Sequence, residues 1–383
     1  MSDSDIVKIM SEQRILLSIN VRWWNAEAAY AVNLARGLLE KGCRVWMIVN
    51  QDSPVQKKAE KYGIPVITNI QLDALSPLSH FFNFRKILRL IDTQNIQLIN
   101  SFKSNGSFLF SLVRYLRPHL TYIKTRGEAR APLQHFVNRK LYGVGACDGI
   151  IAVGSPVKKW LQELKLEGQR LGIVHYGESP ISRQPDSTRE SVRRDFNIPA
   201  ESNVLTLLGR TQRVKGHQLL LDSMRQFKNE PFHLIFLVKD LDEFPEELQQ
   251  LQHSITEYGL QQQVTILGFQ EDLARLLSIT DIGVIPSLSS EVNCRVAVEF
   301  FSLGIPVLAF PTGTLPDLIR DRENGYLTED KKESALVEGI QWMSSDKKRL
   351  RRMGIEAHKN YLEFYTLEKM THETLQFYDL CRR

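Results

Sequence analysis

Several features that would assign this 383-residue sequence to a class at once are missing from it. Its four cysteines, Cys43, Cys147, Cys294 and Cys381, form no CxxC motif and none lies at metal-binding spacing from a histidine. We therefore expect reduced thiols in a cytosolic protein. No apolar run approaches the ~18 residues of a membrane-spanning helix. The first residues are charged and lack an apolar signal core, which also predicts a cytoplasmic location.

Three ligand-binding motifs are absent as well. No GxGxxG follows the first predicted strand of either half, which argues against a dinucleotide-dependent dehydrogenase. No GxxxxGK[ST] is present, which argues against a P-loop phosphotransferase. No DxD-like acidic pair follows a predicted strand, so we expect no metal site of that kind.

Acidic residues are scarce between residues 80 and 140, although the whole chain carries only +5. Eleven Lys and Arg in this segment face two acids, Asp92 and Glu128, so the segment carries +9. Aromatic residues interleave with the cations: Phe81, Phe82, Phe84, Tyr115, Tyr122, Phe136 and Tyr142. Such a face can meet anionic lipid, nucleic acid or an anionic substrate. A solvated surface whose aromatic residues turn inward would give the same sequence.

Short β-rich runs alternate with amphipathic helical patterns along the chain, and its length suggests two domains. The Pro-, Ser- and charge-rich stretch at 177–194 predicts a linker between them. We expect an α/β protein with two doubly wound Rossmann-like domains, at 1–180 and 187–365, that face across a cleft. Ligands of such sheets bind at the carboxyl ends of the strands.

The second domain opens with two cations at the end of its first strand. In "LLGRTQRVKGHQ", Arg210 and Lys215 stand between a strand that ends near Gly209 and a helix that follows Gly216. Two cations beside the free amides of a helix N-terminus are typical of a phosphate site. Arg213 is a less certain third cation. Exposed loops often carry basic residues too, so this motif alone does not decide.

Two acids, Glu291 and Glu299, stand eight positions apart in "SLSSEVNCRVAVEF". On one helix they would lie ~12 Å apart along the axis and ~80° apart around it, too far to share a proton. They suit hydrogen bonds to two places on one long ligand. The amides of residues 292–295 would lie between them and could bind a diphosphate. Alternatively, Glu299 is a buried or capping acid and Glu291 a surface acid.

A series of motifs between Gly209 and Leu327 (GR-x4-KG, "GF…D", and "DI…PS…E-x7-E…G-PV") is similar to the donor domain of family 4 retaining glycosyltransferases of the GT-B fold. The resemblance covers nearly the whole chain. It implies transfer of a sugar from a nucleotide-diphosphate donor, with retention at the anomeric carbon and without a metal or other cofactor. The first domain would hold the acceptor, and a C-terminal helix at about 366–383 would pack back on it.

The resemblance also implies roles for individual residues. Arg210 and Lys215 would hold the donor diphosphate and, with Glu291, would be catalytic. Glu291 would contact the transferred sugar and Glu299 the ribose hydroxyls. The backbone at 268–269 would face the nucleotide base. The donor site would contain Gly209, Arg210, Lys215, Gly268, Phe269, Glu291, Val292, Asn293, Cys294, Arg295 and Glu299.

The sequence departs from the family pattern in two places. Glycines usually follow the first glutamate, but here Val292, Asn293 and Cys294 stand there. The backbone amides remain, while the placement of the sugar would differ. In the segment similar to the family's GG-x-PE, Thr314 stands where the second glycine is common and Asp317 where glutamate is.

The first domain has a tryptophan pair where the family usually has a glycine-rich loop. In "INVRWWNAEAAYAV", Trp23 and Trp24 could stack on sugar rings while Asn25 and Glu27 hydrogen-bond them. We assign these four residues to the acceptor site. A helix N-terminus whose tryptophans pack on the sheet edge would explain the same residues.

Further along, "YIKTRGEARAP" with "NRKLY" resembles a subset of the family that builds lipopolysaccharide or other cell-surface glycans. Arg126, Glu128 and Arg130 would follow a strand and complete the acceptor site. Many family members have a histidine where this sequence has Gly127, and the nearby His135 is not a convincing substitute. The role of a family histidine stays open.

Taken together, these features predict a retaining hexosyltransferase that acts on a glycan or lipid-linked acceptor in lipopolysaccharide or cell-surface polysaccharide biosynthesis. It would be cytoplasmic or peripheral at the inner face of an anionic membrane. Two alternatives remain: a nucleotide-sugar epimerase on the same fold, and a non-catalytic binder of nucleic acid or an anionic surface. No RNP, zinc or helix-turn-helix signature is present, so nucleic acid is not an expected partner. The donor, acceptor and linkage are not predicted.

Overall fold

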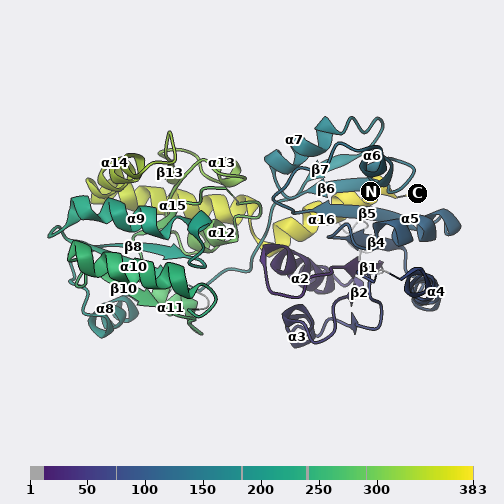
Figure 1. The fold of residues 1–383 in the computed structure, drawn as a ribbon, viewed down its shortest axis with the longest axis horizontal. Coiled ribbons are helices and arrows are strands. Elements are labelled where there is room, and N and C mark those ends of the chain that lie inside the picture. The colour runs from purple at the N-terminus through teal and green to yellow at the C-terminus, as the bar shows by residue number, and fades with distance from the viewer. Residues whose placement is uncertain (1–12, 75, 183, 239–240, 290, 383) are drawn as a thin grey trace. The chain divides into compact units, whose positions relative to one another are not determined.

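The chain divides into two compact units, which Figure 1 shows in a computed structural model. One unit runs to Glu178 and resumes at Thr366, and the other is Ser179–Tyr365. Each contains one sheet whose neighbouring strands all run parallel. The predicted fold class, two doubly wound parallel-sheet domains, is confirmed. The structure describes residues 13–74, 76–182, 184–238, 241–289 and 291–382.

The sheet of the first unit has seven strands among the described residues, in the order β3-β2-β1-β4-β5-β6-β7. The order in which the chain adds strands to the sheet reverses between β1 and β4, and ligands of such sheets bind beyond the carboxyl ends of the strands at this position. The strands are β1 (Arg14–Ser18), β2 (Arg44–Ile48), β3 (Val66–Ile67), β4 (Leu98–Ser101), β5 (Thr121–Arg126), β6 (Gly149–Ala152) and β7 (Leu171–Ile173).

The helices of the first unit cover both faces of this sheet. Because parallel crossovers are right-handed, α2 and α3 lie on one face and α4 to α7 on the other. Helix α16 contacts α2 and so shares its face. The helices are α2 (Ala26–Glu40), α3 (Pro54–Lys61), α4 (Pro77–Gln94), α5 (Ser107–Leu116), α6 (Phe136–Tyr142), α7 (Ser155–Glu163) and α16 (Leu367–Cys381).

Helix α16 lies directly on the sheet of the first unit, where two strand glycines make room for it. A Cβ on Gly149 would stand 2.5 Å from the Sγ of Cys381, and one on Gly172 would stand 2.6 Å from the ring of Phe377. The hydroxyl of Tyr378, which is fully buried, accepts a hydrogen bond of 2.7 Å from the amide of Asn100. The C-terminal helix is thus an integral part of the first unit.

The sheet of the second unit has six strands among the described residues, in the order β10-β9-β8-β11-β12-β13. Here the direction reverses between β8 and β11. The short strand β13 was not predicted, because "NGYL" resembles a turn more than a strand. The strands are β8 (Asn203–Leu208), β9 (Phe232–Leu237), β10 (Val264–Leu267), β11 (Ile282–Ile285), β12 (Val307–Ala309) and β13 (Gly325–Leu327).

The helices of the second unit bury an apolar core against this sheet. Helix α12 sits close to it, since a Cβ on Gly283 would stand 2.4 Å from the ring of Phe300. The helices are α8 (Asp186–Asp195), α9 (His217–Met224), α10 (Pro245–Tyr258), α11 (Leu273–Leu277), α12 (Arg295–Ser302), α13 (Leu315–Leu318), α14 (Glu333–Ser344) and α15 (Lys347–Phe364), with 3-10 turns η1 (Arg213–Lys215) and η2 (Arg225–Phe227).

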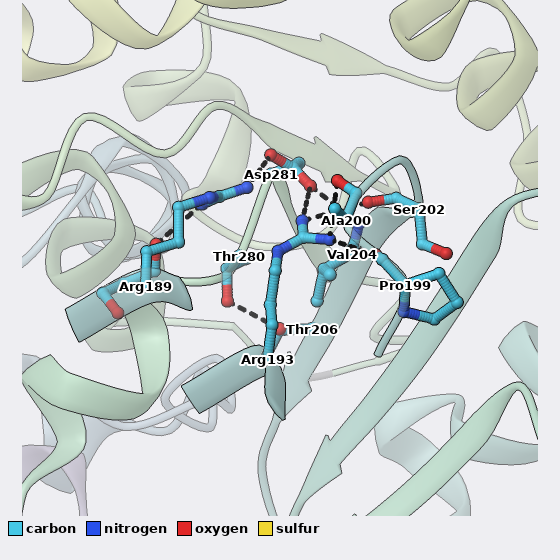
Figure 2. A network of polar contacts seen from close by, with 10 residues as sticks. Arg189, Arg193, Pro199, Ala200, Ser202, Val204, Thr206, Thr280 and Asp281 are labelled. Atoms are coloured by element: carbon cyan, nitrogen blue, oxygen red, sulfur yellow. Dashed lines mark hydrogen bonds and ion pairs between the residues drawn. The ribbon is translucent and has the colours of Figure 1, made fainter. Parts of the chain in front are cut away.

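The linker prediction for 177–194 was wrong over the second half of its length, because α8 forms there. Arg189 and Arg193 of this polar helix both bind the carboxylate of Asp281, at 2.7 and 3.2 Å (Figure 2). Arg193 also donates to the carbonyl of Pro199 at 2.7 Å, and Asp281 accepts from the amide of Val204 at 2.8 Å. The charged residues that suggested solvent exposure instead hold the helix against the starts of β8 and β11.

None of the helices in the described part of the chain combines the length and the apolar composition that crossing a bilayer requires.

Candidate active site

The loops after β8 and β11 touch at the point where the second sheet reverses direction. The first of them returns through η1 to α9 and passes Gly216, whose φ is +77°. A Cβ on Gly216 would stand 2.2 Å from the carbonyl oxygen of Pro286. Beyond this contact the amide of Leu288 donates to the carbonyl of Val214 at 2.8 Å. Glycine at this position therefore allows the two loops to pack together.

This packing brings together two of the predicted site residues. The ammonium of Lys215 forms an ion pair with Oε1 of Glu291, and the hydroxyl of Ser287 donates to the same oxygen at 2.6 Å. The side chain of Glu291 is 12% exposed and that of Lys215 is 27% exposed. Ser287 itself is buried. We call Lys215, Ser287 and Glu291 the lysine–glutamate cluster.

The segment before α13 holds the backbone of Glu291 in place. Gly313 has φ +59°, and a Cβ there would stand 1.8 Å from the carbonyl oxygen of Glu291. The amide of Thr314 donates to that carbonyl at 2.7 Å, and its hydroxyl donates to the carbonyl of Val292 at 2.7 Å. Thr314, one of the departures from the family pattern, therefore anchors the loop that carries the catalytic candidate.

Helix α12 begins next to this cluster. Its N-cap, Cys294, has φ +44°, a left-handed conformation that favours glycine. Its Sγ lies 2.9 Å from the hydroxyl of Thr314, and burial raises the pKa of the thiol well above its ordinary range. Asn293 is 5% exposed, and neither atom of its side-chain amide has a hydrogen-bond partner among the described residues. The glycines of the family are thus replaced by two buried side chains.

The two predicted acids do not share a helix. Glu291 lies in the loop before α12, whereas Glu299 lies within it. Glu299 is 8% exposed and pairs with Arg295 one turn earlier, with an Nε–Oε1 distance of 3.2 Å. The i,i+4 pair holds both side chains against the same side of the helix. The prediction that Glu299 binds a ribose stays a prediction.

The remaining donor-site candidates lie on the loops after β8 and β10. Arg210 is half-buried and pairs with Glu243, before α10, at 3.0 Å. The amide of Gly209 donates to the carbonyl of Leu237 at 3.0 Å and so continues the sheet. Phe269, two residues after β10, is 71% exposed. All these loops follow the carboxyl ends of neighbouring strands.

The first unit has its own charged cluster where its sheet reverses direction. Lys103, in the loop after β4, forms an ion pair with Glu27 in the first turn of α2. Lys103 also lies 3.5 Å from Glu128, which follows β5, and Glu128 binds Arg126 at 2.6 Å. Three of these residues were assigned to the acceptor site. Lys103 was missed, although it stands directly after a predicted strand and so at the same sheet edge.

Glu27 is the most buried acid of this cluster, with 8% of its surface exposed. Its Oε2 pairs with Lys103, whereas its Oε1 has no hydrogen-bond partner among the described residues. Burial raises the pKa of Glu27, and the positive charge of Lys103 partly offsets that rise. A buried carboxylate oxygen that accepts no hydrogen bond costs free energy, and a hydroxyl that reached it would recover part of that cost.

Two sequence profiles match the chain, "Glycosyltransferase Family 4" over residues 28–177 and "Glycosyl transferases group 1" over residues 188–360. One covers most of the first unit, and the other most of the second. The chain belongs to the family 4 glycosyltransferases. The predicted family is thereby confirmed.

The lipopolysaccharide 1,2-N-acetylglucosaminetransferase of Salmonella typhimurium is 26% identical to this glycosyltransferase over 213 residues, which are 53% of this chain and 55% of that protein. Alignments with two other curated relatives, from Bacillus anthracis and Corynebacterium kroppenstedtii, span 62% and 49% of those proteins. A glycosyltransferase structure from Rickettsia africae has a TM-score of 0.86 at 18% identity, covering 97% of this chain and 98% of that one. Anabaena HepE in complex with UDP-glucose has a TM-score of 0.77 at 18% identity, covering 96% and 99%. Identities this low show the shared fold alone.

Sequence reasoning missed a histidine beside the lysine–glutamate cluster of this glycosyltransferase. His217 opens α9, is 3% exposed, and its ring lies 5.2 Å from that of Phe236. Neither ring nitrogen has a hydrogen-bond partner within the described ranges. Burial, with a smaller contribution from Lys215, lowers the pKa of His217 to about 3. The imidazole is therefore neutral. Its position directly after the KG motif was the available signal.

Among the acceptor candidates of this glycosyltransferase, Asn25 caps a helix. Its Oδ1 accepts from the amide of Ala28 at 2.9 Å, so a helix begins here, as the alternative explanation of this segment required. Trp24 stacks under the ammonium of Lys58 at 5.7 Å, while Trp23 is 61% exposed. Of the tryptophan pair, Trp23 thus offers the free ring.

The two arginines that were assigned to the acceptor site, Arg126 and Arg130, differ from each other in their environment. The buried guanidinium of Arg126 donates to the hydroxyl of Tyr142 at 2.7 Å and to the carbonyl of Arg130 at 2.6 Å. Arg126 therefore supports the loop, whereas the side chain of Arg130 is exposed. His135 accepts from the amide of Val137 at 3.4 Å and caps α6. Capping α6 accounts for His135 without a catalytic role.

Proposed function

We propose that this glycosyltransferase moves a hexose-type sugar from a nucleotide-diphosphate donor to a glycan or lipid-linked acceptor, with retention at the anomeric carbon, in the synthesis of lipopolysaccharide or another cell-surface polysaccharide. The lysine–glutamate cluster beside the start of α12 carries the proposal. The UDP-glucose complex of HepE supports the class of donor, and the Salmonella enzyme supports the class of product. Both are similar to this chain only at low identity.

The cluster suits a diphosphate because it places a cation beside the backbone amides at the start of a helix. The amides at the start of α12 favour an anion, and the ammonium of Lys215 lies on the neighbouring loop. A bound diphosphate would share that ammonium with Glu291. The carboxylate would then accept hydroxyl hydrogen bonds from the sugar, as Ser287 already donates to it.

The leaving group of the proposed reaction is a nucleoside diphosphate, on which negative charge develops as the glycosidic bond breaks. Lys215 and Arg210 would stabilise that charge, which is the task that a divalent ion performs in other enzymes. We therefore propose that the reaction needs no metal. Full activity of Arg210→Ala would contradict this role for the arginine.

The acceptor would bind at the charged cluster of the first unit. Glu27 offers a buried carboxylate oxygen, and Trp23 offers an exposed ring on which a sugar could stack. A glycan supplies both hydroxyls and apolar ring faces. Lys103 would hold Glu27 in its ionised form, since it opposes the effect of burial on the pKa.

A thermal-shift panel of UDP-, GDP-, ADP- and CMP-sugars tests the donor part of the proposal. A sugar nucleotide at 100 times its dissociation constant should stabilise the protein by about 2.7 kcal/mol. Lys215→Met should lose this shift, whereas Lys347→Met, at an exposed position on α15, should keep it. No shift with any nucleotide sugar would contradict the proposal.

Incubation with the donor alone distinguishes the transferase from an epimerase. The transferase should leave the sugar of the donor unchanged until an acceptor is added, as read by proton NMR of the nucleotide sugar. Conversion of the donor to its epimer without an acceptor would favour the alternative.

A further inference from the structure

Three neighbouring helices of the first unit, α4, α5 and α6, form a surface to which neither the lysine–glutamate cluster nor Glu27 belongs. Helix α5 contacts α4 on one side and α6 on the other, and right-handed crossovers place all three on one face of the sheet (Figure 1). Arg117 at the end of α5 binds Asp92 of α4 at 2.6 and 2.9 Å. Arg114 donates to the carbonyl of Gly145, just after α6, at 3.0 Å. We call their solvent side the α4–α6 surface.

Large apolar side chains face solvent across this surface. On α5, Leu109 and Val113 pack into the core, whereas Phe108 and Tyr115 are 68% and 78% exposed. Helix α5 is therefore apolar on its buried and exposed sides alike. The exposed apolar side chains extend to both neighbouring helices and include Phe81, Phe82, Phe108, Tyr115, Leu133 and Phe136. Other aromatic residues of the basic segment, namely Phe84, Phe102, Phe110, Tyr122 and Tyr142, turn inward, wholly or in part.

Six exposed cations share the surface with these apolar residues. They are Arg85, Lys86, Arg89, Arg130, Arg139 and Lys140, and none of them forms an ion pair with any described residue. The two acids of the segment are already engaged, Asp92 by Arg117 and Glu128 by Arg126 and Lys103. The positive charge of the surface is thus uncompensated.

We propose that the α4–α6 surface docks on an anionic lipid membrane, with its apolar side chains in the headgroup region and its cations against the lipid headgroups. A membrane takes up both features at once, because it buries phenylalanine and leucine and attracts lysine and arginine. A nucleic-acid backbone would satisfy the cations and leave Phe108 and Leu133 in water. A second copy of the chain would cover the apolar residues but oppose one positive surface to another.

Co-sedimentation of the full chain with vesicles tests the proposal. We expect binding at low salt to phosphatidylcholine vesicles that contain about a third phosphatidylglycerol, weaker binding as salt rises, and little binding to phosphatidylcholine alone. Each cation near an anionic surface is worth about fivefold in the partition coefficient, so Arg85→Gln with Arg89→Gln should reduce binding about thirtyfold. Phe108→Ser with Tyr115→Ser should reduce the binding that survives at high salt.

Matched control variants lie on α15 of the second unit. Arg351→Gln with Arg352→Gln removes two exposed cations, and Ile355→Ser with Leu362→Ser removes two exposed apolar side chains. Both should sediment like the unchanged protein. Circular dichroism of each variant shows whether it is folded, so that loss of binding reports on the surface.

Equal binding to neutral and anionic vesicles, or undiminished binding of both surface variants, would overturn the proposal. So would binding to a mixed-sequence RNA in the absence of vesicle binding, which would assign the surface to nucleic acid. The assay contains no donor and does not rest on the proposed function. A protein that binds vesicles but no nucleotide sugar would contradict the transferase and leave this inference standing.

Discussion

Lys215 and Glu291 stand 76 positions apart in the chain and form an ion pair between the loops after β8 and β11. The two strands are neighbours in the sheet, so their following loops meet at one edge. A third residue, Ser287, donates to the same carboxylate oxygen at 2.6 Å. The acid is thereby held in place by two donors before any ligand is considered.

Replacing either Lys215 or Glu291 should reduce turnover, and both replacements should act by breaking the ion pair between them. We expect Lys215→Met to lower kcat by about a hundredfold or more, because it deletes a cation beside developing negative charge. Glu291→Gln should also lower kcat. The double variant should lose much less than the product of the two single losses, since both break one interaction. Independent, multiplicative losses in steady-state assays would contradict this coupling.

The left-handed N-cap of α12 makes an unusual prediction for Cys294. With φ +44°, any residue that has a Cβ is strained there by about 1–2 kcal/mol. Cys294→Gly should therefore be more stable than Cys294→Ala by about 1 kcal/mol, the reverse of the order inside a helix. Ala297→Gly, in the interior of the same helix, should cost about 1 kcal/mol. Urea unfolding of the three variants measures their stabilities. A Cys294→Ala variant more stable than Cys294→Gly would refute the prediction.

His217 should make the protein less stable in mild acid. Its pKa is about 3 in the folded chain and 6.5 ordinarily, so below pH 6.5 only the unfolded state takes up a proton. Stability then falls as the pH falls toward 3, by about 1.4 kcal/mol per unit. Between pH 7 and pH 5 the unchanged protein should lose about 2 kcal/mol more than His217→Met in urea unfolding. Parallel pH profiles of the two proteins would contradict this.

Lys103 should matter to stability chiefly through Glu27. Lys103→Met leaves a buried carboxylate without its cation, which should cost about 2–3 kcal/mol at neutral pH. Because the folded pKa of Glu27 is raised above 4.5, this cost should be absent at acidic pH, where the folded acid is protonated in both proteins, and should grow as the pH rises through the raised pKa. Adding Glu27→Gln should restore most of the loss at neutral pH.

The same variant should separate the two substrates in kinetics. If Glu27 binds the acceptor, Lys103→Met should raise the KM for the acceptor and leave the KM for the donor nearly unchanged. Steady-state assays with each substrate varied in turn measure the split. A rise in the donor KM alone would move this cluster out of the acceptor site.

The sequence could predict the position of those site residues that directly follow a strand. Lys215 and Glu291 each follow a buried strand, and parallel strands deliver such residues to one edge, so their meeting could be expected. The edge at which Lys103 and Glu27 lie could be expected as well, but the direct contact of either pair also depends on which strands are neighbours in the sheet. That order is decided by contacts across the sheet, about which the local pattern says nothing.

The errors in the fold have similar causes. The polar composition around Arg189 and Arg193 indicated a linker, yet a single distant acid, Asp281, organises both into a helix. The three residues of β13 pair with β12, whereas the local sequence there predicted only a turn. In both places tertiary contacts override local preference.

The position of α16 in the first unit sets the order in which the chain can fold during synthesis. Its contacts with Gly149, Gly172 and Asn100 form only after the 187 residues Ser179–Tyr365 have been made. At ribosomal speeds this is a delay of roughly ten to forty seconds. Until then the strands that α16 covers expose apolar surface, while the second unit, which is continuous in sequence, can complete its core. The first unit, whose synthesis starts before that of the second, is therefore the last to complete its fold.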